Sequence, residues 1–296
     1  MKKVTAIILA CLFALSMTAA CAGTDNTGSS GSAGSGGSSG NGFNTDRVIA
    51  VFTREDGSGT RDAFVNITGV GDDMYIEAVV QNGTSQILTS VETNETGIGY
   101  VSVGSLSTAV KALTINGVMP SNETIMNGTY SLQRPFLVVV NDDMKDDPLV
   151  SDFIDFMLSI EGQELSSARQ TPSVNNPSAY SPGGLSGTIK IGGSTSMDDL
   201  MNSIREAYIA HNPGVEIEIS GGGSGTGIQE ATTGILHIGM SSRALRDNEK
   251  EALTDIAIAL DGVAVIVNMG NPISGLDLDQ VKEIFVGDIT RWNQLS

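Results

Sequence analysis

Residues 188–228 read TIKIGGSTSMDDLMNSIREAYIAHNPGVEIEISGGGSGTGI, and this stretch decides the fold class. It contains two successive units, each made of a short apolar strand, a loop of small residues and a helix. The predicted strands are Thr188–Ile191 and Val215–Ile219, and apolar residues at helical spacing from Met197 to Tyr208 predict the first helix. Such alternation favours an α/β fold with open sheets, in which ligands bind at the carboxyl ends of the strands.

The same alternation extends over the chain from residue 48 onward. Further strands are predicted at Val48–Phe52, Ile98–Val103 and Phe136–Val140 and in the apolar stretch Ile256–Asn268. Further helices are predicted at Arg61–Ile67, from Pro148 to near Gly162, from Ile228, around Asn248–Leu253 and after the capping residue Asp277. Ser173–Gly187 is rich in Pro, Gly, Ser and Asn, which predicts a connector.

Three of the loops between strands and helices are rich in glycine and hydroxyl side chains. The tetrapeptide Gly-Ser-Gly-Thr occurs at Gly57–Thr60 and again at Gly223–Thr226, and the third loop contains Ser194–Ser196. Glycine lets backbone N–H groups approach a ligand closely, and a helix start adds the positive end of its dipole. Ser196 followed by Asp199 resembles a capping box, which places the third loop at a helix start as well. Together the loops predict an anion-binding site.

Arg54 and Asp56 lie just before the first Gly-Ser-Gly-Thr loop. If the three loops meet, Arg54 can give a paired contact to two oxygens of a tetrahedral anion. Asp56 can either orient this arginine or accept a proton from the anion. The alternative interpretation is that the loops are only tight turns and that Arg54 forms a surface ion pair, as single features of these kinds usually do.

The composition argues against several classes of function. The formal net charge is −18, which disfavours binding to nucleic acid, so a bound anion must be held by local donors. Cys11 lies in the predicted leader, so the mature domain has no cysteine pair, and a disulfide scaffold and a thiolate metal site are excluded. We expect no other metal site and no cofactor. The chain has neither a nucleophile elbow nor a phosphate loop with lysine, so we expect no enzyme; a Ser224–His237 pair is formally possible, but its spacing does not support it.

Residues 1–20 are predicted to be a secretory signal peptide, because basic residues precede an apolar stretch that is too short to span a membrane. Cys21 follows two alanines and resembles the lipidated cysteine of bacterial lipoproteins, although Thr18 stands where leucine is usual. The alternative is an ordinary signal peptide with a chance cysteine. Gly, Ser, Thr and Asn dominate residues 21–46, which predicts a flexible tether.

A set of longer motifs, from about Arg47 to Ser296, resembles the phosphate-binding lipoproteins of bacterial ABC phosphate importers. The motifs are REDGSGTR at Arg54–Arg61, GSTS at Gly193–Ser196, GGSGTG at Gly222–Gly227, DGVAVIVN at Asp261–Asn268 and IFVGDITRW at Ile284–Trp292. The resemblance implies a type II periplasmic-binding-protein fold, in which two α/β lobes close on one phosphate ion. It also implies a lipid anchor at the extracytoplasmic face of the cell membrane and delivery of phosphate to the permease and ATPase subunits of an importer. We expect a monomer.

These motifs occur in a different order from that of the family. In the family the GSTS motif comes first and the Arg54–Arg61 motif follows the segment that ends here at Trp292. The sequence therefore resembles a circular permutant, in which the connector at residues 170–187 joins the family's usual C-terminus to its usual N-terminus. The predicted lobes are residues 47–133 plus 266–296 and residues 134–265, with crossovers near Ser131–Phe136 and Gly262–Asn268.

The resemblance assigns phosphate contacts to both lobes. The residues carried over are Arg54, Ser58, Gly59 and Thr60 on one lobe and Thr195 and Ser224 on the other, with Ser194 and Ser196 as secondary candidates. Many members have an aspartate at the position of Ser242, where it accepts the phosphate proton and helps to exclude sulfate. With Ser242 in its place, Asp56 is the remaining acidic acceptor, although a serine hydroxyl can also accept a proton. The alternatives left open are a receptor for another oxyanion (sulfate, arsenate or molybdate), a secreted phosphate-ester hydrolase and a phosphate sensor without transport.

Overall fold

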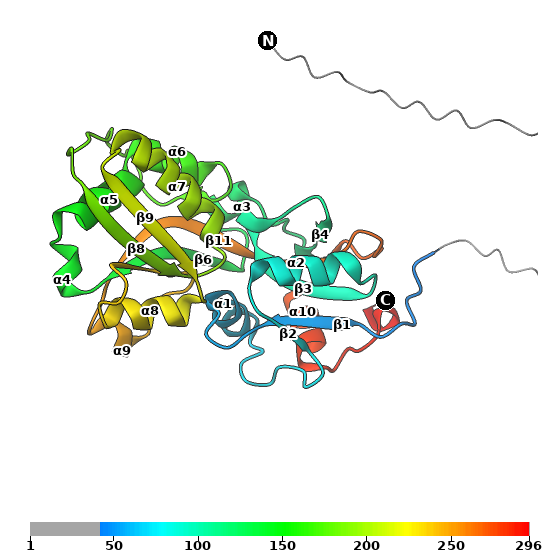
Figure 1. Cartoon of the computed structure of the whole chain (residues 1–296). Coiled ribbons are helices and arrows are strands. Elements are labelled where there is room, and N and C mark those ends of the chain that lie inside the picture. The colour runs from blue at the N-terminus through cyan, green and yellow to red at the C-terminus, as the bar shows by residue number, and fades with distance from the viewer. Residues whose placement is uncertain (1–41, 296) are drawn as a thin grey trace, which may run out of the picture. The chain divides into compact units, whose positions relative to one another are not determined.

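The structure is a computed structural model that describes residues 42–295 (Figure 1). The predicted signal peptide, Cys21 and the tether up to residue 41 lie outside the described residues. Within residues 42–295, no helix combines the length and the apolar character that a membrane span requires.

Most strands form one mixed sheet in the order β2-β1-β3-β11-β6-β10-β8-β9, with β4 and β7 attached to β11. Neighbours within the groups β2-β1-β3 and β10-β8-β9 run parallel, whereas β11 runs antiparallel to β3 and β6. The bounds are β1 Ala50–Arg54, β2 Val79–Gln81, β3 Gly97–Ser102, β4 Val110–Ala112, β6 Gln133–Val140, β7 Thr171–Pro172, β8 Gly187–Gly193, β9 Val215–Gly221, β10 Ile238–Ser241 and β11 Thr254–Asn268. A separate small sheet pairs β5 Thr114–Ile115 with β12 Gly275–Leu276.

The long strand β11 belongs to two parts of this sheet (Figure 1). Its residues 254–262 pair with β6, and its residues 263–267 pair with β3. We call the part built on β1, β2 and β3 lobe A and the part built on β6, β8, β9 and β10 lobe B. The change of partner falls at Val263, earlier than the predicted lobe boundary between Val265 and Ile266. The other crossover is at Gln133, where β6 begins opposite Gly262.

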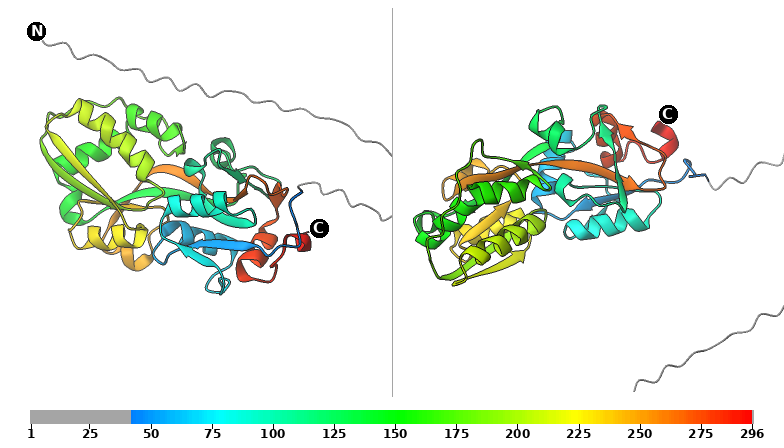
Figure 2. Two further views of the ribbon diagram at one scale, coloured as in Figure 1. Left: turned by 45° about the vertical axis from the view of Figure 1, so that its right-hand side comes forward. Right: turned by 90° about the horizontal axis from the view of Figure 1, so that it is seen from above.

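In each lobe, helices pack against the sheet (Figure 2), and buried apolar side chains form a hydrophobic core between them. In lobe A, Phe64, Tyr100 and Phe285 pack together, and the rings of Phe64 and Tyr100 stack with centroids 4.0 Å apart. In lobe B, Phe153 and Tyr208 form an edge-on contact in the core under α5 and α7. The helices are α1 Gly59–Thr68, α2 Thr84–Thr93, α3 Asn122–Met126, α4 Asp142–Lys145, α5 Pro148–Leu158, α6 Ile160–Ser167, α7 Asp198–His211, α8 Ser224–Thr232, α9 Asp247–Lys250 and α10 Leu278–Val286, with single 3₁₀ turns at Val103–Ser105 and Trp292–Leu295. The predicted α/β class is confirmed.

Several helix ends differ from those predicted. The helix from Pro148 stops at Leu158, because Ser159 ends α5 and caps α6 by accepting the Gly162 N–H. Helix α8 begins at Ser224 rather than Ile228, because the glycines before it let the chain turn directly into the helix. The helix predicted around Asn248–Leu253 is only the short α9.

The predicted capping box of Ser196 and Asp199 is wrong. Helix α7 begins at Asp198 with Met197 as its N-cap residue, and no side chain caps it. The Ser196 hydroxyl is instead hydrogen-bonded to Thr60 of lobe A. The loop therefore precedes a helix as predicted, but its hydroxyl group serves a contact between the lobes.

The beginning and the end of the described chain lie side by side. Val48 forms an antiparallel bridge with Arg291, and the Asn293 N–H donates to the Thr45 carbonyl over 2.9 Å. The Ile49 N–H donates in the same way to the Thr290 carbonyl. The two ends of the described chain are thus adjacent in the fold.

Candidate functional site

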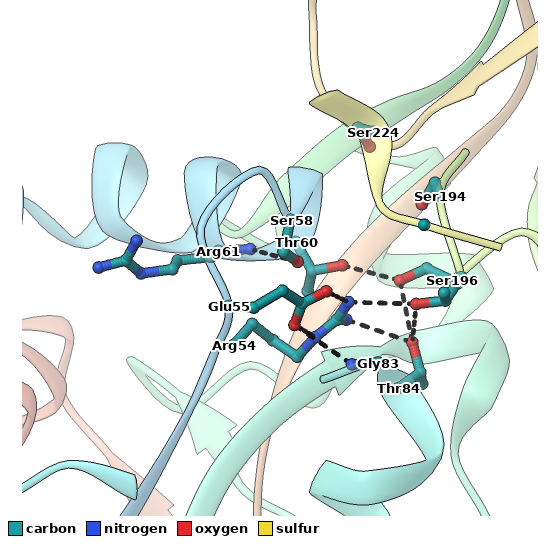
Figure 3. Close-up of polar contacts among 12 residues, drawn as sticks. Arg54, Glu55, Ser58, Thr60, Arg61, Gly83, Thr84, Ser194, Ser196 and Ser224 are labelled. Carbon is teal, nitrogen blue, oxygen red and sulfur yellow. Dashed lines mark hydrogen bonds and ion pairs between the residues drawn. The ribbon is translucent and has the colours of Figure 1, made fainter. Parts of the chain in front are cut away.

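The three glycine-rich loops meet where lobe A faces lobe B (Figure 3). The loop after β1 leads into α1, the loop after β8 into α7, and the loop after β9 into α8. A backbone hydrogen bond of 2.9 Å from the Gly225 N–H to the Gly57 carbonyl joins the first loop to the third. All three loops follow the carboxyl ends of strands, which is where open α/β sheets bind ligands.

Arg54 lies at the end of β1 with a side chain only 2% exposed. Its Nε and Nη2 donate to the two carboxylate oxygens of Glu55 over 2.8 and 2.7 Å, so the two groups face each other as a fork. The Gly83 N–H donates to the same carboxylate. Burial raises the pKa of Glu55, but the hydrogen bonds and charge of Arg54 outweigh it and hold the pKa below its usual value.

Asp56 does not take the predicted role of orienting Arg54. Its side chain is 93% exposed and forms an ion pair with Arg61. The tight turn through Gly57, which has a φ of 81°, points Asp56 to solvent, while Glu55 one residue earlier remains beside the guanidinium. Of the two roles left open for Asp56, orienting Arg54 belongs in the structure to Glu55.

Hydroxyl groups of the two lobes contact each other directly. Thr60 Oγ1 of lobe A and Ser196 Oγ of lobe B are hydrogen-bonded over 2.7 Å, and Arg54 Nη2 donates to Thr195 Oγ1 over 3.1 Å (Figure 3). These side chains are buried or half-buried. Residues more than 130 positions apart in the chain thus form one polar cluster.

Thr84 also belongs to this cluster, although it is not among the site residues predicted from the sequence. Its Oγ1 accepts from Arg54 Nη1 over 3.4 Å and lies 3.3 Å from Thr195 Oγ1 and 3.4 Å from Ser196 Oγ. Thr84 is the first residue of α2 and follows Gly83, directly after β2. The other loops have the same succession of strand, glycine, hydroxyl residue and helix. Thr84 could have been predicted from this pattern.

Three buried serines form a connected group within lobe B. Ser194 Oγ donates to Ser242 Oγ over 2.8 Å, and the Ser242 N–H donates to Ser224 Oγ over 3.0 Å. Gly59 of lobe A packs onto this group so closely that a Cβ at its position would overlap Ser224 Oγ and lie 2.8 Å from Ser242 Oγ. Only glycine therefore fits at this point of contact between the lobes.

The start of α1 presents backbone donors beside these serines. Ser58 is the N-cap residue, and its Oγ accepts the Arg61 N–H, so this hydroxyl is engaged in capping. Gly59 and Thr60 form the first turn, whose N–H groups have no partner within the helix. With Ser224 at the start of α8, two helix N-termini of opposite lobes adjoin the cluster.

A second buried ion pair lies behind the cluster, where the chain crosses between the lobes. Arg134 Nη2 and Asp261 Oδ2 are 2.9 Å apart, and Ser102 donates to the same carboxylate. Burial raises the pKa of Asp261 and lowers that of Arg134, while the charge of each partner opposes the shift. Because both residues stand on the crossover strands, the pair fixes their register.

The described residues offer no metal site and no nucleophile–histidine pair. Among residues 42–295, no group of three His, Cys, Asp or Glu side chains is placed to hold a metal ion. His237 Nδ1 accepts the Lys190 N–H, whereas Ser224 Oγ bonds with Ser242. The cluster itself presents one guanidinium, backbone N–H groups and hydroxyls, which are donors suited to an anion.

Comparison with known proteins agrees with this architecture. A family profile described as a PBP superfamily domain matches residues 38–161 and 178–296. The phosphate-binding protein PstS 2 of Streptococcus pneumoniae serotype 4 is 40% identical over 256 residues, which cover 83% of this chain and 87% of that protein. The chain belongs to the PstS family of the PBP superfamily.

Other PstS comparisons differ in how much they cover. A crystal structure described as the phosphate-binding protein of a phosphate ABC transporter from S. pneumoniae TIGR4 superposes with a TM-score of 0.70 and 39% identity, over 84% of this chain and 100% of that one. The PstS of Bacillus subtilis strain 168 is 32% identical over only 131 residues, 43% of this chain and 44% of that protein. The type II periplasmic-binding-protein fold is thus shown, and some PstS relatives align with only about half of this chain.

Proposed function

We propose that this PstS-family protein binds inorganic phosphate between lobes A and B and delivers it to an ABC importer. The observation that carries the proposal is that a buried guanidinium, several hydroxyls and two helix starts, contributed by both lobes, meet in one cluster. Such donors replace the hydration of a tetrahedral anion, and the helix dipoles add a favourable field. The relatives described above are phosphate-binding proteins, which supports phosphate as the anion.

In this proposal each lobe supplies a defined share of the contacts. Lobe A contributes Arg54, the hydroxyl of Thr60 and the N–H groups of Gly59 and Thr60, with Thr84 as an additional donor; the Ser58 N–H already donates to the Glu55 carbonyl. Lobe B contributes Thr195 and Ser224, with Ser194, Ser196 and Ser242 beside them. Hydroxyls that bond to one another across the lobes exchange these bonds for phosphate oxygens. Asp56 is left out because it faces solvent.

The proposed mechanism is binding by closure, without a chemical step or a cofactor. Phosphate binds first to one lobe, and closing of the other lobe excludes water and completes the donor set. Glu55 acts here as a positioning residue, because its carboxylate holds the Arg54 guanidinium with Nη1 and Nη2 directed at Thr84 and Thr195. Reopening releases the ion to the importer.

The cellular setting follows from the sequence and is part of the same proposal. Lipidation of Cys21 anchors a monomer at the extracytoplasmic face of the membrane, and residues 21–46 tether it there. The anchored protein then serves the permease and ATPase subunits of an importer.

We also propose that the chain is a circular permutant of the more usual PstS order. Three observations support this. Residues 45–49 lie against residues 290–293, so a continuous chain between them fits the fold. A collinear alignment of permuted sequences covers only part of each chain, and the B. subtilis relative aligns over 43% of this chain, whereas PstS 2 of S. pneumoniae aligns over 83% and so has the order seen here. The break in the family match at residues 162–177 falls within or just before the predicted connector.

Calorimetric titration of the purified protein with phosphate, arsenate and sulfate tests the proposal. We expect phosphate to bind with a dissociation constant in the micromolar range or below, and absence of phosphate binding by folded protein would contradict the proposal. A receptor for a different oxyanion is the second candidate, because Ser242 offers a hydroxyl rather than a carboxylate at the position that would accept the phosphate proton. Sulfate binding as tight as phosphate binding would favour it. Turnover of a phosphate ester would favour a hydrolase.

A further inference from the structure

Asp62 of α1 makes the ion pairs that join the faces of the two lobes. Its Oδ2 lies 2.9 Å from Arg243 Nε and 2.9 Å from Arg246 Nη2. Asp62 belongs to lobe A, whereas both arginines follow β10 in lobe B. Apart from the Arg134–Asp261 pair on the crossover strands, all other ion pairs seen among residues 42–295 stay within one lobe.

Lobe B holds Arg243 in place independently of Asp62. Arg243 Nη1 and Nη2 donate to the two carboxylate oxygens of Glu249 over 2.7 and 2.8 Å, and the Ser241 hydroxyl donates to the Arg243 carbonyl. The remaining nitrogen, Nε, is the one that faces Asp62. The arginine is therefore preorganised, and its pairing with lobe A depends only on the approach of the lobes.

These ion pairs are partly removed from solvent. The side chains of Asp62 and Arg243 are 18% and 8% exposed, whereas Arg246 is 64% exposed. A cavity of about 250 Å³ beside them, lined by Asn66 and Gln133 among others, leaves room for the groups to separate without repacking a core. Such a pair is worth more than an exposed one, because few waters screen it.

The ion pairs adjoin the proposed phosphate site through the sequence itself. Arg243 follows Ser242, and Asp62 comes two residues after Thr60 on the first turn of α1. When Thr60 and Ser242 come together on a ligand, Asp62 and Arg243 necessarily come together as well. Neither Asp62 nor Arg243 contacts the hydroxyl cluster, so they can change closure without changing the ligand contacts.

We infer that Asp62, with Arg243 and Arg246, is a latch that stabilises the closed state and so sets the affinity and residence time of the ligand without touching it. This inference rests on the proposed binding between the lobes. The apparent affinity depends on the intrinsic affinity of the closed state and on how favourable closure is. A weaker latch makes closure less favourable, so phosphate binds more weakly and is released faster.

The test compares Asp62→Asn with wild-type protein in phosphate titrations and in stopped-flow release of phosphate. We expect the dissociation constant to rise roughly 5- to 50-fold, mostly through faster dissociation. The difference should shrink in 1 M NaCl, because salt screens the ion pairs. Unchanged affinity and dissociation rate in Asp62→Asn would overturn the latch.

Two further variants separate the latch from general damage. Asp199→Asn removes a similar carboxylate, which pairs with Arg169 inside lobe B, and should leave phosphate binding unchanged. Arg246→Gln should weaken binding less than Asp62→Asn, and adding it to Asp62→Asn should have almost no further effect, because both act on one interaction. Independent, additive losses would contradict the latch.

Failure of the proposed function gives a different pattern. If folded wild-type protein binds no phosphate, the proposed function fails, and the same variants are then compared with whichever of sulfate or arsenate binds. Small-angle X-ray scattering at low salt measures how compact the protein is and so follows closure of the lobes without a phosphate titration. With bound anion, the wild-type protein should be more compact than Asp62→Asn at equal, subsaturating anion concentration; identical profiles would count against the latch.

Discussion

The two lobes bring different chemistry to the same cluster. Lobe A contributes a charge, Arg54, which is fixed by an adjacent carboxylate, whereas the three serines of lobe B are neutral and are fixed by hydrogen bonds to one another. The position of Arg54 depends on an ion pair, whereas the positions of the serines depend on buried hydrogen bonds. The difference suggests that lobe A supplies most of the attraction for an anion, while lobe B supplies shape and additional donors.

Removing the positive charge of Arg54 should lower phosphate affinity more than any other of these changes. Arg54→Ala takes away the cation and leaves Glu55 unpaired beside the anion, so we expect phosphate affinity to fall at least ~30-fold. Calorimetric titration measures this. Arg47→Ala, which removes an exposed arginine of lobe A paired with Glu95, is the matched control and should bind normally. A loss below about 3-fold for Arg54→Ala would show that lobe A is not the charged half of the site.

The variant Glu55→Gln tests whether Glu55 affects phosphate binding mainly through its negative charge or by positioning Arg54. Glu55→Gln removes a negative charge close to the anion, which alone would strengthen binding. If the carboxylate positions Arg54 as proposed, binding instead weakens about 10-fold. Asp56→Asn is the control, because this neighbouring carboxylate is exposed. Tighter phosphate binding by Glu55→Gln, measured in the same titration, would disprove the positioning role.

Truncating the serines of lobe B should have a smaller effect. Ser224→Ala removes one neutral donor, so we expect phosphate affinity to fall ~3- to 10-fold. Ser203→Ala, on the exposed side of α7, is a matched control. A loss from Ser224→Ala as large as that from Arg54→Ala would show that the lobes do not differ in the way described.

The smallest of these effects should be that of Glu249→Gln on the stability of the fold at acid pH. Hydrogen bonds from Arg243 hold the pKa of Glu249 below its usual value of 4.5, in spite of partial burial. A lowered folded-state pKa means that Glu249 stabilises the fold above its unfolded pKa and loses this effect as the pH falls below about 4.5. Between pH 7 and pH 3, the thermal unfolding temperature of Glu249→Gln should therefore fall less steeply than that of the wild-type protein. An equal slope would argue against the ion pair with Arg243.

Much of this architecture could be predicted from the sequence. Strand–loop–helix alternation predicted the α/β class, because its periodicity is local, and the motifs predicted the fold type. The role of Glu55 could not be predicted, since it depends on where the turn at Gly57 directs each side chain. Thr84 was missed because its loop lacks the repeated tetrapeptide, and its approach to Arg54 is a tertiary contact.

The misassigned cap of α7 has a similar cause. Ser196 and Asp199 have the spacing of a capping box, but the Ser196 hydroxyl has a competing partner in Thr60 of the other lobe. Local patterns report what a residue can do within its own segment. They do not report a partner that lies more than a hundred residues away.

A crystal structure of the protein grown with phosphate tests the central claim most directly. We predict one phosphate ion between the lobes, contacted by Arg54 and Thr60 from lobe A and by Thr195 and Ser224 from lobe B. A phosphate ion contacted by residues of only one lobe, or bound away from this cluster, would contradict it.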